Sequence, residues 1–287
     1  MKPWKFTQKT IGYGIAKEAY WSVLAGSATL PPLLALVNPS GEGGAVEGFL
    51  APLGAGASKE DLGRPLARGN YVLSSKDRKT VLLMTVLNPQ EAGYDPAPVL
   101  NSAFGATLSP EVRARIGATR FLVQMRFESH HPMVIPSLVF LLSFLKRLSE
   151  LTNGLVADAF AMTYKLPEEV FVPDPVGEID VRDHISITSF ADSDGIRMET
   201  NGFRKFALQD FEITSLRDQD RVLANNALCS ISQFVLEGNK ALVGQQFGDP
   251  TRPLQLAAGT LRSGGIQKIE LIPVKGTLSE ALEYFRG

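Results

Sequence analysis

The clearest alternation of hydrophobic and polar positions lies between residues 119 and 171. TRFLVQMRFE has the pattern of a strand, and MVIPSLVFLLSFLKRLSEL has the apolar spacing of a helix that ends at Asn153-Gly154. A second apolar run, residues 155–166, predicts another strand. The segment therefore predicts one β-α-β unit, around which the other elements are expected to be organised.

The N-terminal third has a less regular pattern. Gly12 and Gly14 interrupt a helix predicted over residues 10–25, and a strand is predicted over residues 33–37. Residues 38–70 are glycine-rich and predict a long loop with a short helix near residues 59–62. A strong β pattern follows at Thr80–Leu87, and Ser109-Pro110 predicts the start of a short helix.

Short strands and two helices are predicted after residue 180. The period-2 pattern of residues 184–190, the turn sequence Asp192-Ser193-Asp194-Gly195 and the run from Ile196 to Thr200 predict a β-hairpin. A further strand is predicted at residues 208–214 and a helix at residues 219–237. Strands are predicted at residues 241–247, 254–261 and 267–272, with a turn at residues 263–265, and Thr277 with Glu280 forms a capping-box pattern that predicts a terminal helix.

This order of elements favours an α+β fold, with a mainly antiparallel sheet and helices on one face. A ferredoxin-like split β-α-β core with additions would accommodate it. We expect a glycine-rich N-terminal region, residues 1–105, packed on a core domain of residues 106–287, although one continuous domain fits the length as well.

Composition excludes some classes of protein. The chain has 29 basic and 30 acidic residues, well interspersed, which argues against nucleic-acid binding. The most apolar run has about 14 residues, whereas a membrane span needs about 20. The single cysteine, Cys229, is expected to be a small buried hydrophobe in a reducing compartment, and no signal peptide is recognisable. These features predict a cytoplasmic protein.

The passage from residue 173 to residue 216 resembles a bacterial family known as domain of unknown function 4261. That family has the segment Thr-x-Gly-φ-x-x-Phe-Gly-φ-x-Glu-φ-Glu-φ, where φ is apolar. The matching residues here are Thr200, Gly202, Phe203, Phe206, Ala207, Leu208, Asp210, Phe211, Glu212 and Ile213. The sequence departs from the family at Ala207, where glycine is usual, and at Asp210, where glutamate is usual. The resemblance covers about residues 119–275 and implies a fold neighbourhood, because the family has no established activity.

Four residues are candidates for chemistry. His130 and His131 follow the first strand of the β-α-β unit, where ligands often bind in open α/β sheets. Asp158 lies inside an apolar strand, so it must be paired or have a shifted pKa, and Arg182 or His184 across the sheet would be its partner. A solvated turn and a structural salt bridge are the alternatives for these two sets.

The other motifs favour structural interpretations. Asp192 to Gly195 resembles the start of a calcium loop but lacks the later ligands. The glycine-rich residues 41–57 lack the GK[ST] ending of a phosphate loop. Polar residues in strand-like segments, namely Glu199, Arg204, Lys205, Asp210 and Glu212, are expected to form a solvent-exposed face. No cofactor or metal ligand set is indicated.

Two functions follow as hypotheses. The first is a non-enzymatic interaction, immunity-like or assembly protein that binds another protein or a second copy of itself. The alternative is a small-molecule or metal-dependent enzyme, hydrolase-like, that uses His130, His131, Asp158 and His184. The enzyme hypothesis requires these side chains to converge on one pocket.

Overall fold

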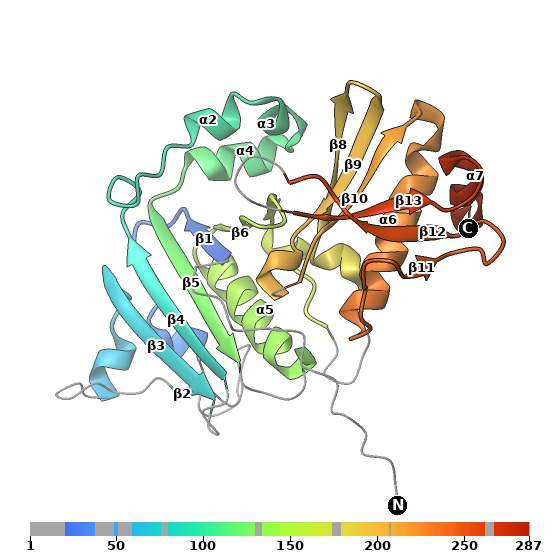
Figure 1. The fold of residues 1–287 in the computed structure, drawn as a ribbon. Coiled ribbons are helices and arrows are strands. Elements are labelled where there is room, and N and C mark those ends of the chain that lie inside the picture. The colour runs from blue at the N-terminus through green and yellow to red at the C-terminus, as the bar shows by residue number, and fades with distance from the viewer. Residues whose placement is uncertain are drawn as a thin grey trace, which may run out of the picture. The chain divides into compact units, whose positions relative to one another are not determined.

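The computed structural model describes residues 21–37, 49–50, 59–75, 80–129, 134–173, 179–206, 208–261 and 267–286. These residues form two compact units, each with its own sheet (Figure 1). The N-terminal unit comprises residues 21–159 and 163–173, and the C-terminal unit comprises residues 160–162 and 179–286. The division expected after residue 105 instead falls inside the N-terminal unit, because strands on both sides of that position pair in one sheet.

The N-terminal unit contains a seven-stranded sheet in the order β2-β3-β4-β5-β1-β6-β7, and every neighbouring pair is antiparallel. The strands are β1 (Trp21–Ala25), β2 (Phe49–Leu50), β3 (Gly69–Ser75), β4 (Thr80–Leu87), β5 (Phe121–Ser129), β6 (Leu155–Asp158) and β7 (Thr163–Lys165). The bounds of β4 agree with the strand that its residue pattern predicted.

The predicted β-α-β unit is formed by β5, helix α5 (Val134–Leu151) and β6. Strand β1 lies between β5 and β6, so that Trp21 is opposite Met125 on one side and Asp158 on the other. Because β1 is antiparallel to both, β5 and β6 run parallel to each other, which is a split β-α-β arrangement. The helix predicted over residues 10–25 is therefore wrong for β1, since hydrogen bonds to two distant strands override a weak helical pattern. Residues 10–20 lie outside the described part.

Two other short segments differ from their predicted structure. Residues 33–36 form a one-turn helix, α1 (Leu33–Leu36), in place of a strand, with Leu33 and Leu36 buried. The expected single strand over residues 155–166 is a hairpin of β6 and β7, which reverses at Met162 with a φ of 55°. The short helix expected near residue 60 is present as a 3-10 helix, η1 (Lys59–Gly63).

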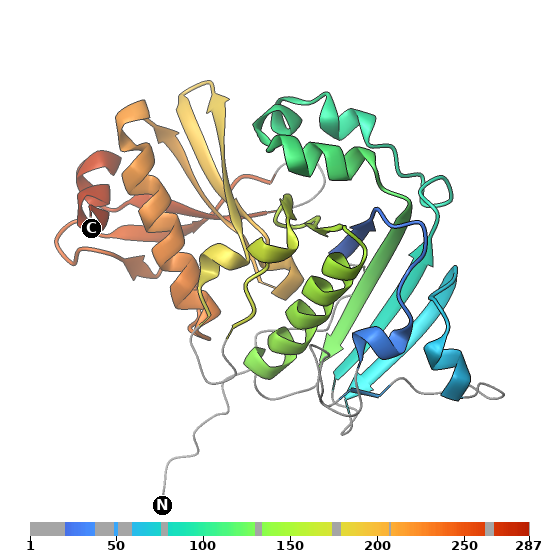
Figure 2. The same ribbon diagram turned by 180° about the vertical axis from the view of Figure 1, so that it is seen from behind.

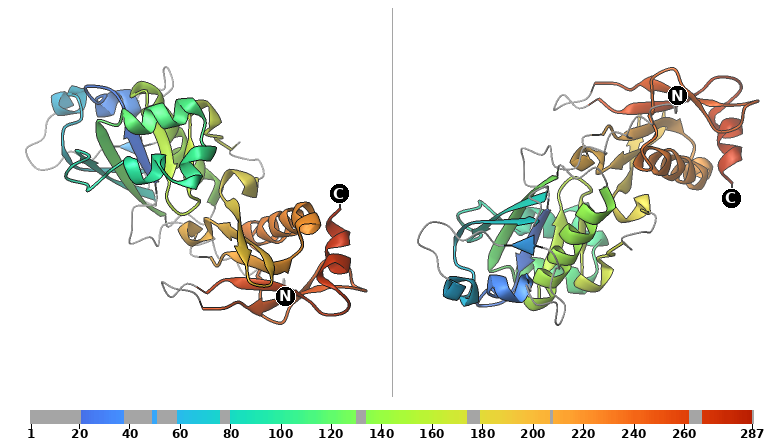
Figure 3. Two further views of the ribbon diagram at one scale, coloured as in Figure 1. Left: turned by 90° about the horizontal axis from the view of Figure 1, so that it is seen from above. Right: turned by 90° about the horizontal axis from the view of Figure 1, so that it is seen from below.

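Helices cover different parts of the two faces of this sheet. Helix α5 lies along one face (Figure 2). On the other face, α2 (Ala97–Leu100), α3 (Ala103–Thr107) and α4 (Pro110–Gly117) cover one end (Figure 3). There Val112 and Ile116 of α4 are packed in one cluster with Leu24, Leu122 and Leu155. The predicted N-cap of α4 is confirmed, because the Ser109 hydroxyl accepts a hydrogen bond from Val112 N–H at 3.2 Å. The 3-10 helix η2 (Pro167–Glu169) follows β7.

The C-terminal unit contains a six-stranded sheet in the order β11-β12-β13-β10-β9-β8, in which only β10 and β13 are parallel neighbours. The strands are β8 (Ser186–Asp192), β9 (Gly195–Asn201), β10 (Phe211–Leu216), β11 (Gln246–Phe247), β12 (Leu254–Ala258) and β13 (Ile269–Pro273). The predicted hairpin is confirmed, since β8 and β9 pair in register up to Asp192 opposite Gly195. The turn expected at residues 263–265 lies outside the described residues.

The helices of this unit also follow local signals in the sequence. They are η3 (Val181–Asp183), η4 (Phe203–Phe206), η5 (Asp218–Asp220), α6 (Arg221–Leu236), α7 (Leu278–Leu282) and η6 (Glu283–Phe285). Helix α6 packs its buried residues, among them Leu228 and Ile231, against β9 and β10. The capping box of α7 is confirmed, because Thr277 and Glu280 each accept the other's backbone N–H.

The α+β class and the mainly antiparallel pairing are thus confirmed, with the strands divided between two sheets. Within the described ranges, no helix has both the length and the apolar composition needed to cross a bilayer.

Candidate functional site

The predicted site residues are distributed over different parts of the chain. His130 and His131 lie outside the described residues. Asp158 is buried in β6 of the N-terminal unit, opposite Trp21 and Thr163. His184 is buried in the C-terminal unit, where its ring meets Phe206 edge-on with centroids 5.7 Å apart. The prediction that one sheet carries Asp158 and the partner segment is wrong, because β6 and the strand after His184 belong to different sheets.

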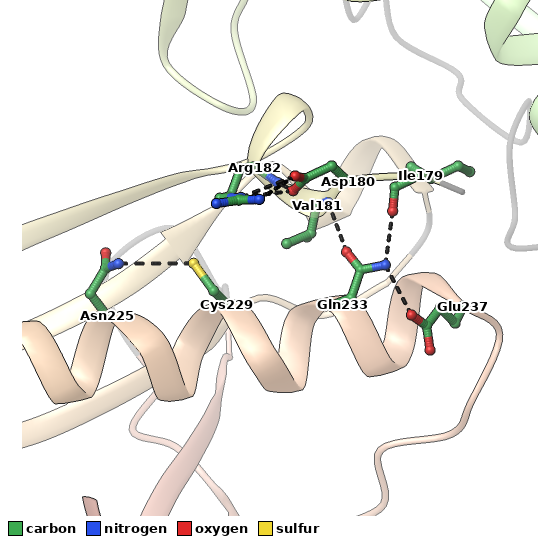
Figure 4. Close-up of polar contacts among 8 residues, drawn as sticks. All are labelled: Ile179, Asp180, Val181, Arg182, Asn225, Cys229, Gln233 and Glu237. Atoms are coloured by element: carbon green, nitrogen blue, oxygen red, sulfur yellow. Dashed lines mark hydrogen bonds and ion pairs between the residues drawn. The ribbon is translucent and has the colours of Figure 1, made fainter. Parts of the chain in front are cut away.

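The segment before His184 is held by an ion pair and by a glutamine of α6 (Figure 4). Arg182 Nη2 lies 2.5 Å from Asp180 Oδ2, and hydrogen bonding to Arg182 holds the pKa of Asp180 below its usual range. The Gln233 side chain accepts from Val181 N–H at 2.9 Å and donates to the Ile179 carbonyl at 2.8 Å. These contacts attach η3 to α6, so we assign the polar residues of this segment a structural role.

The surroundings of Cys229 disfavour its reactive, ionised form. Its thiol is partly buried on α6, with Asn225 Nδ2 at 4.0 Å from Sγ (Figure 4). Burial raises the pKa of the Cys229 thiol, so the reactive thiolate is disfavoured at neutral pH. Across the described residues, no group of three or more His, Cys, Asp or Glu side chains is arranged to hold a metal ion.

The charged residues expected on a solvent-exposed face are mostly buried. Lys205 is 2% exposed and Glu212 is 0% exposed, and Glu199 and Asp210 are also buried, whereas Arg204 is exposed. The physical reason is pairing with distant residues, which compensates the loss of hydration. Glu199 illustrates this, since its carboxylate lies 3.1 Å from Lys268 Nζ and 3.5 Å from Arg197 Nε. Lys205 Nζ donates a short hydrogen bond to the His184 carbonyl.

The segment that carries the motif of domain of unknown function 4261 connects β9 with β10, and hydrogen bonds to Asp210 hold its two ends together. Thr200 Oγ1 donates to Asp210 Oδ1 at 3.1 Å, and Phe203 N–H donates to the same oxygen at 3.2 Å. Phe203 packs edge-on against Phe206 and Phe211, with centroids 6.3 and 5.9 Å away. Burial raises the pKa of Asp210 despite these hydrogen bonds. The described residues of the motif are therefore buried in this unit, apart from the half-buried Leu208.

A concave surface that could bind a ligand lies on the N-terminal unit, on the part of the sheet that α2, α3 and α4 leave uncovered. A cavity of about 360 Å³ opens there over strands β3, β4 and β5. We call it the open sheet surface and define it by Asn70, Val72, Leu83, Thr85, Gln124 and Arg126. The register of the strands arranges these residues in two rows, Val72-Leu83-Arg126 and Asn70-Thr85-Gln124.

The open sheet surface combines an aliphatic centre with polar groups. Val72 is 41% exposed and is adjacent to Leu83 across the strands. The Thr85 hydroxyl donates to Asn70 Oδ1 at 2.9 Å, which orients the amide in the neighbouring row. Arg126 supplies a guanidinium group, and the described residues that line the cavity include no carboxylate, imidazole or thiol. Such a set of groups can bind a ligand by burial, hydrogen bonding and charge.

This surface was not identified from the sequence. The alternation along β4 and β5 indicates that each strand has one buried and one polar face. Which face remains uncovered depends on where α2 to α4 pack, and no local signal reports that.

Comparisons of the chain with protein-family models, with curated proteins and with solved structures found no match. The resemblance to domain of unknown function 4261 accordingly stays a prediction, as does the enzyme hypothesis built on His130, His131, Asp158 and His184.

Proposed function

We propose that this chain is a non-enzymatic binding protein whose open sheet surface receives a segment of a protein partner. The observation that carries the proposal is the lining of that surface, where the exposed Val72 and the half-buried Leu83 adjoin amide, hydroxyl and guanidinium groups, with no carboxylate, imidazole or thiol among the described lining residues. Interfaces commonly combine an apolar centre with a polar rim. Immunity-like and assembly proteins are intracellular classes that fit this description.

The chemistry of the surface indicates the occupant. Val72 and Leu83 offer an apolar patch for one aliphatic or aromatic side chain. Arg126 lies across the strand from Leu83, so a carboxylate next to that apolar side chain would be complementary in charge. We therefore expect a polypeptide segment in which an apolar residue adjoins Asp or Glu.

The experiment compares capture of partners by the full-length chain and by surface variants. Val72→Glu places a carboxylate in the apolar patch, and Arg126→Glu reverses the charge. Val222→Glu is the matched control, because Val222 is 70% exposed on α6 of the other unit. A protein recovered from cells that express the chain should bind the wild type and Val222→Glu equally, and should bind Val72→Glu at least tenfold more weakly.

The affinity of the recovered protein is then measured with purified components, together with circular dichroism to verify that each variant is folded. A folded Val72→Glu and a folded Arg126→Glu that both retain wild-type affinity would exclude the open sheet surface. Recovery of no protein at all, from a chain shown to be monomeric, would remove the basis for a binding role.

A further inference from the structure

The four outer strands of the two sheets differ greatly in length. Strand β2 has two residues within the described ranges, β11 has two and β7 has three, whereas β8 has seven. Very short outer strands are a common protection against pairing with another chain, because they expose few backbone donors and acceptors. In the described part of the chain, β8 alone is a long outer strand.

Strand β8 also lacks the other common forms of protection. Its sequence is SITSFAD, which has no Lys, Arg or Pro, and its pairing with β9 continues without a bulge from Ser186 to Asp192. The strand becomes exposed toward its end, where Phe190 is 41% exposed. A long, regular and nearly uncharged outer strand is suited to adding another strand.

The hairpin geometry identifies which backbone groups face outward. Asp192 and Gly195 flank a two-residue loop, so they form the hydrogen-bonded pair that closes the turn. Hydrogen-bonded residues alternate along an antiparallel strand, and Ile187, Ser189 and Ala191 therefore direct their N–H and C=O groups away from β9.

We propose that β8 pairs antiparallel with β8 of a second copy of this chain, in a register centred on Ser189. This register places Ile187 opposite Ala191 of the other copy and Ser189 opposite its own equivalent, so that outward donors and acceptors meet. A two-fold axis produces this self-complementary arrangement. The site is independent of the open sheet surface, which belongs to the other unit.

The side chains are compatible with this register. Thr188 comes opposite Phe190 of the other copy, an aromatic and β-branched pair that stabilises sheets. Asp192 comes opposite Ser186, so the charged residue of the strand does not meet another carboxylate. Near the axis, the Arg221 guanidinium donates to Ser189 Oγ at 2.7 Å and is balanced by Asp218, at 2.7 Å from Nε.

The experiment introduces charged side chains at Ser189, the residue on the proposed two-fold axis. In the proposed register, Ser189→Lys places two like charges opposite each other, and so does Ser189→Glu. Each variant alone should have the mass of one chain, 31.1 kDa, by size exclusion with light scattering, while the wild type has twice that mass. An equimolar mixture of S189K and S189E should restore the dimer, because unlike charges then meet. Ser193→Lys, in the exposed hairpin turn, is the matched control and should remain dimeric.

Hydrogen exchange of the wild type provides a second measurement that needs no variant. The amides of Ile187, Ser189 and Ala191 should exchange at least tenfold more slowly at high than at low protein concentration. A wild type that has the mass of one chain at all concentrations would overturn the proposal. A dimer that S189K leaves intact would also overturn the proposal, because it would use another interface. The same holds if β8 pairs only with a strand of a different protein.

Discussion

Thr200 Oγ1 donates a hydrogen bond to Asp210 Oδ1 and accepts one from Phe211 N–H, at 3.1 and 2.8 Å. Thr200 and Asp210 are ten residues apart, and their contact closes the segment that connects β9 with β10. All three groups are buried, so each depends on the others for its hydrogen bonds.

Replacing Thr200 by valine should destabilise the protein by about 1–3 kcal/mol, because the isosteric change leaves a buried N–H and a carboxyl oxygen without their shared partner. Urea unfolding of the two proteins measures the difference. Thr251→Val is the control, since Thr251 donates to Asp249 at 2.9 Å in an exposed turn and its loss should change stability by less than about 0.5 kcal/mol. Equal effects at the two positions would contradict the structural role of Thr200.

Asp210 should make the folded state less stable as pH rises. Burial raises its pKa above the ordinary value of 3.8, so the folded state retains a proton that the unfolded state has lost. The stability of the wild type relative to Asp210→Asn should therefore decrease from about pH 4 up through the raised pKa, and then become constant. Urea midpoints of both proteins over this range measure the trend. An increase with pH would show that ionised Asp210, near Lys268, is the stabilised form.

Asp220 should show the opposite dependence on pH. Burial alone would raise its pKa, but hydrogen bonds from Ser279 and Arg217, at 2.6 and 3.1 Å, outweigh that effect and hold the pKa below 3.8. The stabilisation of the folded state by ionised Asp220 is fully present above the pKa that Asp220 has in the unfolded chain. It is lost as pH falls through the lowered pKa of the folded state. The stability advantage of the wild type over Asp220→Asn should accordingly shrink as pH falls below 3.8. An advantage that does not change with pH would indicate that the ionised carboxylate is not involved.

Gly202→Ala should be more destabilising than Gly244→Ala. Both glycines have positive φ, at 132° and 91°, where an L-residue is strained by roughly 1–3 kcal/mol. At Gly202 an added Cβ would also lie 2.7 Å from the His184 carbonyl oxygen, whereas the space around Gly244 is open. The difference between the two thermal midpoints isolates the steric clash. Similar midpoints would mean that the backbone of residues 184 and 185 moves to make room.

Local sequence signals predicted many elements correctly. The capping residues Ser109 and Thr277 determine where α4 and α7 begin, and the Asp192 to Gly195 turn determines the β8–β9 register, because these interactions involve only neighbouring residues. Strand β1 was missed, since its structure depends on two partners that are distant in the sequence. The two-unit division was missed for the same reason.

The residues of the candidate site were harder to predict from the sequence than the strands and helices. Glu199 appeared exposed because its partner Lys268 is far away in the sequence. Val72 and Arg126 had no motif, and only the register of β3, β4 and β5 brings them onto one surface. Conversely, the sequence suggested Arg182 as a partner of Asp158, whereas the structure shows Arg182 in an ion pair with Asp180, the N-cap residue of η3.

The position of β1 between β5 and β6 affects how the protein can fold during its synthesis. The ribosome makes Trp21–Ala25 before β5 and β6, and these two neighbours are complete only after Asp158. A nascent chain that is shorter than this carries an apolar strand without both of its partners, which exposes it to aggregation. We therefore expect co-translational folding of the N-terminal unit to begin late and to make this unit, during biosynthesis, a substrate for chaperones that bind near the ribosomal exit.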